Sequence, residues 1–97
     1  MNNWHTQDVD KLFEGILSLQ NKEECYRFFE DACTIKEILE MAQRLKAAQM
    51  LSEGVNYNDV SSATGMSSAT ISRVNKCLTY GAGGYQLVLD RINQNDK

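Results

Sequence analysis

The hydrophobic positions of this chain recur every three or four residues over most of its length, which is the spacing of amphipathic α-helices. A first helix is predicted from about Val9 to residue 19, with Thr6 or Asp8 as its N-cap. A second helix follows Asn21, and the glutamate three residues later completes a capping-box pattern. Its apolar face includes Phe28 and Phe29, which we expect in the core.

The third predicted helix is the longest and runs from Ile35 to about Ser52, with Thr34 and Glu37 in capping-box positions at its start. Its apolar residues spread over an arc of roughly 200°, about twice the width that a helix resting on one surface needs. We therefore expect this helix to pack against several neighbours, some of them from a second chain. Gly54 is suited to end it.

Residues 56–79 predict two short helices that meet at Gly65. Asn56 is suited to cap the first of these helices, and Ser67 or Ser68 to cap the second, which reaches about Thr79. Glycine adopts the positive φ that a tight turn between helices requires. Apolar residues stand where two such helices must pack together, a pattern typical of a helix-turn-helix unit. A last helix is predicted over residues 84–93, after a glycine-rich joint.

The outward face of the helix after Gly65 is polar and built from small residues. If Ile71, Val74 and Leu78 face inward, the residues between them form an outward stripe with two cations. Small side chains permit a close approach to the major groove, hydroxyls bond base edges or phosphates, and a methyl group can meet thymine. The predicted DNA-binding residues are Ser67, Ser68, Ala69, Thr70, Ser72, Arg73 and Lys76.

Each of these residues has an expected role. Ser67 and Ser68 should cap the helix and meet phosphate, while Thr70 and Ser72 should face base edges. Arg73 and Lys76 should supply the salt-sensitive attraction to the DNA backbone.

Composition and charge are compatible with this hypothesis. The chain has 97 residues, 11.0 kDa, no proline and 42% hydrophobic residues, which predicts a single all-α domain over 1–97. The net charge is −3, but residues 1–33 hold seven acidic and three basic side chains. Residues 57–80 hold two basic and one acidic side chain and are the only segment with a positive balance, which is the local potential that a polyanion would meet.

Other kinds of chemistry find little support in the sequence. Cys25, Cys33 and Cys77 form an odd set without metal-ligand or disulfide spacing, so we expect them as small buried hydrophobic residues. No catalytic or nucleotide-binding motif is found, so the sequence predicts no enzyme, no catalytic residue, no metal and no cofactor. Because no stretch is long and apolar enough for a membrane span and no secretory signal is found, a cytoplasmic protein without membrane contact is expected.

The segments EECYRFFEDACTIKEI, MAQRLKAAQMLSEG and ATGMSSATISRVNKCLTYG, within residues 23–81, carry a resemblance to the Trp repressor superfamily. The chain most resembles its small branch of YerC/YecD-type, Trp-repressor-related proteins. The resemblance implies an all-α, six-helix, intertwined homodimer with a helix-turn-helix unit in each chain. In such a dimer the two reading helices enter successive major grooves about 34 Å apart, so the operator should be roughly palindromic.

The resemblance also implies a possible corepressor pocket. Thr34, Arg44 and Arg73 match the threonine and two arginines that surround the amino-acid corepressor of the Trp repressor, and a guanidinium can grip a carboxylate. Two pocket positions depart from the family pattern, because Val74 replaces a glycine and Cys77 replaces a serine. Val74 would fill the space of an indole ring, which argues against tryptophan. The alternatives are a solvated or salt-bridged Arg44 and an Arg73 that serves DNA.

The sequence thus predicts a homodimeric transcription regulator, specifically a repressor, that binds double-stranded DNA. Its single domain would comprise a helical dimerisation core over 8–53, the helix-turn-helix over 56–79 and the C-terminal helix over 84–93. Two alternatives remain, namely a helical adaptor that binds protein and not DNA, and a repressor gated by an unknown small-molecule corepressor.

Overall fold

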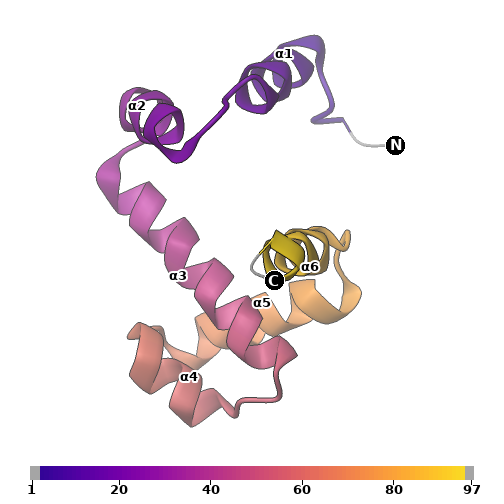
Figure 1. Cartoon of the computed structure of the whole chain (residues 1–97). Coiled ribbons are helices and arrows are strands. Elements are labelled where there is room, and N and C mark those ends of the chain that lie inside the picture. Colours follow the sequence, from indigo (N-terminus) through magenta and orange to yellow (C-terminus); the bar gives the residue numbers. More distant parts are fainter. Residues whose placement is uncertain (1–2, 96–97) are drawn as a thin grey trace. The chain divides into compact units, whose positions relative to one another are not determined.

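All of the regular secondary structure in residues 3–95, the part of the chain that the computed structural model describes, is helical. The six helices confirm the predicted all-α class (Figure 1); they are α1 (Gln7–Leu17), α2 (Lys22–Ala32), α3 (Ile35–Ser52), α4 (Tyr57–Thr64), α5 (Ser68–Tyr80) and α6 (Gly84–Asn95). The last helix is two residues longer than predicted. Met1, Asn2, Asp96 and Lys97, which the predicted domain 1–97 includes, lie outside the described residues.

The chain forms two compact units, one extending through Ile38 and the other beginning at Leu39. The division falls inside α3. The second unit holds α4, α5, α6 and the part of α3 from Leu39 onward, and the candidate site is built from these elements.

The predicted capping box forms in full at the start of α3, whereas at the start of α2 the Glu24 carboxylate accepts from the amide before the N-cap residue and not from the Asn21 amide. Asn21 Oδ1 accepts a hydrogen bond from the Glu24 amide at 2.9 Å, and Glu24 Oε1 accepts one from the Gln20 amide at 2.8 Å. At the start of α3, Thr34 Oγ1 accepts from the Glu37 amide at 3.1 Å, and Glu37 Oε1 accepts from the Thr34 amide at 2.9 Å. These bonds satisfy amides that have no partner within the helix.

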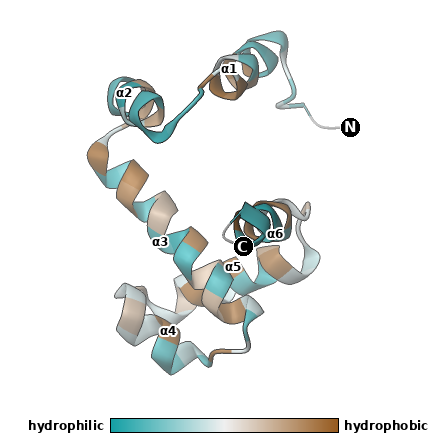
Figure 2. Ribbon diagram, viewed as in Figure 1, coloured by the Kyte–Doolittle hydropathy of each residue, from teal (hydrophilic) through white to brown (hydrophobic). Residues whose placement is uncertain are grey.

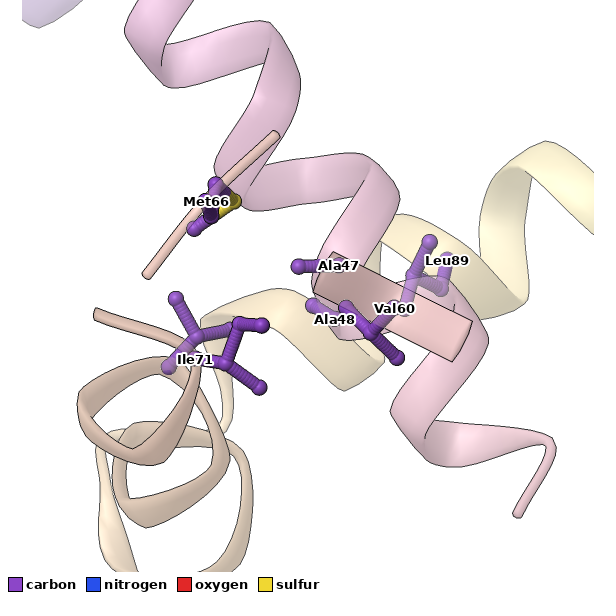
Figure 3. Packing of buried hydrophobic residues seen from close by; sticks show 7 residues of the cluster. Ala47, Ala48, Val60, Met66, Ile71 and Leu89 are labelled. Carbon is purple, nitrogen blue, oxygen red and sulfur yellow. The ribbon is translucent and has the colours of Figure 1, made fainter. Parts of the chain in front are cut away.

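The core of the second unit forms where α4, α5 and α6 meet the C-terminal half of α3. Figure 3 shows the small side chains of Ala47 and Ala48 projecting from α3 into this core. Because both are alanines, the neighbouring helices can approach α3 closely. The buried hydrophobic residues are Ala47, Ala48, Val60, Met66, Ile71, Val74 and Leu89.

Neither α1 nor α2, both described throughout, contains a buried residue. The prediction that Phe28 and Phe29 lie in the core is therefore wrong for the single chain: both are half-buried, with ring centroids 5.3 Å apart in an edge-to-face pair. The three cysteines also depart from expectation, because Cys25 and Cys77 are exposed and Cys33 is only half-buried. The physical reason is that a helix with one apolar stripe needs a covering surface, which these short segments do not supply by themselves.

The wide apolar arc of α3 is also incompletely covered. Hydrophobic positions recur along the whole helix (Figure 2), and Ile35, Leu39 and Met41 are 60%, 58% and 51% exposed. At 100° per residue Leu39 and Met41 lie near opposite edges of the apolar arc, so a single chain leaves both edges uncovered. None of the helices in residues 3–95 is long and apolar enough to cross a membrane.

Candidate nucleic-acid interface

The turn between α4 and α5 has the geometry that the sequence predicted. Gly65 ends α4 in the left-handed conformation with φ of 74°, and its amide donates to the Ser61 carbonyl at 2.7 Å. Two residues later, Ser67 caps α5, since its hydroxyl accepts a hydrogen bond from the Thr70 amide at 3.2 Å. Residues 57–80 therefore form two short helices joined by a three-residue turn.

The inner face of α5 is anchored in the core. Ile71 is fully buried and Val74 is 2% exposed, and both belong to the cluster that contains Ala47 and Ala48 of α3. Leu78, the third residue expected to face inward, is half-buried. This anchoring holds the opposite face of α5 towards solvent.

The exposed face of α5 brings together most of the predicted DNA-binding residues. The exposed members are Ser67, Ser68, Ala69, Ser72, Arg73 and Lys76. Both cations stand on this face, and the first turn of α5 contains no acidic residue. The backbone amides of that first turn point out of the helix start, where a phosphate can accept their hydrogen bonds.

Thr70 differs from the other predicted contacts. It is half-buried, and its hydroxyl lies 3.1 Å from the Ser67 hydroxyl, within hydrogen-bonding distance. The side chain therefore has a partner at the helix start, and its role at a base edge stays a prediction.

Two hydroxyl groups of α4 that the sequence analysis did not single out also shape this site. Ser61 Oγ donates to the Met66 carbonyl at 2.8 Å, and Thr64 Oγ1 accepts from the Met66 amide at 3.2 Å. The same Thr64 hydroxyl donates to the Val60 carbonyl at 2.7 Å. The available signal was the presence of Ser and Thr in the last turns of a helix before a predicted turn, where such side chains often bond nearby backbone.

The residues of the predicted corepressor pocket are distributed over different environments. Arg44 is half-buried and Cys77 exposed, and both line a cavity of about 630 Å³. Arg73 lies on the exposed face of α5, while Val74 is enclosed in the core. Thr34 precedes α3, and its hydroxyl is bonded to Glu37 in the capping box. The cavity thus contains two of the five positions, and its full lining is Met41, Ala42, Arg44, Leu45, Cys77, Gly81, Ala82, Gly84, Tyr85 and Val88.

These features define the class of protein. A glycine joint, a second helix anchored by its apolar side, and an outer face of small polar and cationic residues together make a helix-turn-helix protein. The family model described as Trp repressor protein matches residues 7–93. The chain belongs to the Trp repressor family, a family of DNA-binding regulators.

Individual relatives agree with this assignment. The uncharacterised protein YerC of Bacillus subtilis is 52% identical over 90 residues, which cover 93% of this chain and 86% of that protein. The crystal structure of a TrpR-like protein from Eubacterium eligens is 50% identical with a TM-score of 0.92, covering 96% of both chains. A second solved structure is described as that of a putative Trp repressor from Staphylococcus aureus. Its sequence is 45% identical to this chain, and the match has a TM-score of 0.88 and covers 92% of this chain and 89% of the other.

Proposed function

We propose that this protein is a sequence-specific DNA-binding transcription repressor that reads a roughly palindromic operator as an intertwined homodimer. The observation that carries the proposal is the exposed polar face of α5 on a helix whose other side is anchored by Ile71 and Val74. Membership of the Trp repressor family supports the same interpretation.

In this proposal α5 lies in the major groove with its first turn against the DNA backbone. Ser68 and the neighbouring amides bind a phosphate, and the Ala69 methyl group can meet the methyl group of a thymine. Ser72 bonds a base edge, and Thr70 is retained as a contact in the same role. Arg73 and Lys76 neutralise phosphates or, where the geometry allows, read guanine.

Two copies of α5 are needed because a single chain offers few contacts. Residues 57–80 carry a net charge of only +1, so a dimer doubles a small electrostatic attraction. The exposed apolar residues of α3 provide a surface that a second chain can cover. Two reading helices about 34 Å apart would meet successive major grooves on one side of the duplex.

Selection of bound DNA from a random pool tests this proposal. The purified full chain should enrich a roughly palindromic sequence whose half-sites are about 10 base pairs apart. Failure to enrich any sequence, together with free passage over a heparin column at low salt and co-purification of a partner protein, would instead establish the adaptor function.

The cavity supports a second candidate, in which a small molecule gates the repressor. Its lining is largely apolar and includes Arg44, a cationic residue type that can bind a carboxylate, so the cavity is suited to a small acid with an apolar body. Cys77, which lines the cavity where the family pocket has a serine, lacks the serine hydroxyl, and this disfavours tryptophan. Repeating the selection with and without amino acids, and screening small carboxylic acids for a rise in melting temperature, tests this candidate.

A further inference from the structure

Met66 is the middle residue of the joint between α4 and α5, and side-chain hydroxyls of α4 hold both of its backbone polar groups. The Met66 amide donates to Thr64 Oγ1, and the Met66 carbonyl accepts from Ser61 Oγ. The Met66 side chain is 8% exposed and belongs to the core cluster, as Figure 3 shows. The residue that links the two helices is thus fixed at its amide, its carbonyl and its side chain.

Thr64 is the buried polar residue of this joint, with 7% of its surface exposed. Its hydroxyl is used twice, because it accepts from Met66 and donates to the Val60 carbonyl at 2.7 Å. If this hydroxyl is removed, the Met66 amide is left without that partner, and solvent has little access to the site. The joint is then free to adopt other angles between α4 and α5.

A small change of that angle affects short and long side chains differently. A helix of 13 residues is about 20 Å long, so a tilt of about 10° about its start would move its far end by about 3 Å. Ser72, about 7 Å from the start, would move by about 1 Å, which is enough to break a hydrogen bond from a short side chain. Long, flexible cations such as Arg73 and Lys76 can follow a phosphate over that distance.

We propose that Ser61 and Thr64 are positioning residues for DNA readout, which set the angle of α5 and thereby the discrimination between operator and other DNA. Neither hydroxyl needs to touch DNA for this role, because each acts through Met66. This inference rests on the proposed DNA-binding function and adds to it two residues that determine specificity from behind the reading face.

The variants that test this role separate the hydroxyl from the volume of the side chain. Thr64→Val removes the hydroxyl and keeps the shape, whereas Thr64→Ser keeps the hydroxyl. Ser61→Ala tests the second bond at a half-buried site and remains informative if Thr64→Val fails to fold. Ser62→Ala removes an exposed hydroxyl from the same helix, and Thr79→Val removes a hydroxyl that bonds the Asn75 carbonyl at 2.9 Å away from the joint.

For each full-length variant, affinity is measured for the operator selected by the wild type and for an unrelated duplex, well below the lowest melting temperature of the set. Thr64→Val and Ser61→Ala should bind the operator about three- to tenfold more weakly, the size expected when one intramolecular hydrogen bond is removed. Affinity for the unrelated duplex should stay within about twofold, since phosphate contacts persist. Thr64→Ser and both control variants should match the wild type on both duplexes.

Two results would overturn the inference while leaving the proposed function intact. One is unchanged operator affinity in both Thr64→Val and Ser61→Ala. The other is an equal loss on operator and unrelated DNA, which indicates a loss of folded protein and not of orientation. A wild-type protein that selects no DNA would instead refute the proposed function itself, and the DNA role of the two hydroxyls with it.

Discussion

Gly65 is the residue whose backbone conformation the helix-turn-helix unit most directly requires. Its φ of 74° is open to glycine at little cost, and a Cβ built there would meet nothing within 4 Å. We expect Gly65→Ala to lower the free energy of unfolding by about 1–2 kcal/mol, because an L-residue is strained in the left-handed region. Urea unfolding monitored by circular dichroism measures this change.

Gly15 supplies the matched control for the Gly65 substitution. It lies in α1 without a positive φ, and a Cβ there would also meet nothing within 4 Å. Gly15→Ala should therefore leave the stability unchanged or raise it by up to about 1 kcal/mol. Equal losses in both variants would show that the left-handed conformation is not what Gly65 contributes.

Glu37 makes the stability of the chain depend on pH at the start of α3. The Thr34 amide, and after it the Thr34 hydroxyl, bond the Glu37 carboxylate and hold its pKa below the ordinary value of 4.5. A carboxyl whose pKa is lower in the folded state stabilises that state above its unfolded pKa, and the contribution is lost as the pH falls through the folded pKa.

Glu37→Ala should therefore be less stable than the wild type near neutral pH, and the difference should shrink as the pH falls below 4.5. Unfolding curves between about pH 7 and pH 3 measure the difference. Glu37→Gln keeps an acceptor for the capping box but cannot titrate, so its own unfolding profile should lack this step. A gap between Glu37→Ala and the wild type that stays constant to about pH 3 would contradict the assignment.

Single residues were predictable from the sequence where their hydrogen bonds are local. The N-caps of α2 and α3 and the glycine of the turn are read from neighbours within four residues, and all three are present. The bonds from Ser61 and Thr64 to Met66 were not foreseen, because they form only once the chain has turned back at Gly65. Half-burial of Thr70 was also missed, although its partner Ser67 is only three residues away, because burial depends on how the chain packs around the start of α5 and not on the local pattern.

At the scale of an element, α5 combines an anchored side with a charged one. Arg73 and Lys76 are exposed on the side opposite Ile71 and Val74, so their removal should not disturb the core. We expect the double variant Arg73→Ala, Lys76→Ala to bind operator more weakly and with a flatter dependence of log affinity on log salt. For each phosphate that a chain no longer neutralises, the slope should fall by about 1.

Fluorescence anisotropy on the selected operator over a range of salt concentrations measures this slope. Arg91→Ala, which removes an exposed cation from α6, is the control and should leave the slope unchanged. The same slope in the double variant and the wild type would show that neither Arg73 nor Lys76 neutralises a DNA phosphate.

Elements were the most predictable level of this structure. Each helix is bounded by a capping side chain or a glycine, and the 3.6-residue period of apolar positions is unbroken between them, so every helix was expected close to its observed bounds. The exceptions are α1, which begins and ends two residues earlier than expected, and the end of α6 at Asn95, because a polar sequence without a stop signal does not indicate where a helix frays.

Which side chains are buried depends on the packing of the whole molecule, and the sequence predicted burial less well than it predicted helices. Apolar periodicity shows which side of a helix must be covered, but not whether the cover comes from the same chain. Phe28 and the cysteines were expected inside for this reason, and a single chain leaves them at or near its surface. Likewise, the sequence names candidate pocket residues, but whether they line one cavity depends on helix packing, which separates Val74 from Arg44.

The exposed apolar residues of α3 bear on whether the chain assembles into a dimer. Leu39 is 58% exposed on a helix whose apolar arc is wider than its own chain covers. If a second chain covers it, sedimentation equilibrium should give twice the chain mass of 11.0 kDa, and the melting temperature should rise with protein concentration by mass action.

Leu39→Glu should weaken association because it places a charge in an apolar contact. Gln43→Glu adds the same charge at an exposed site of the same helix outside the apolar arc and should leave the mass unchanged. A wild-type protein that stays at 11.0 kDa with a concentration-independent melting temperature would rule out the dimer, and a palindromic operator would then lose its physical basis.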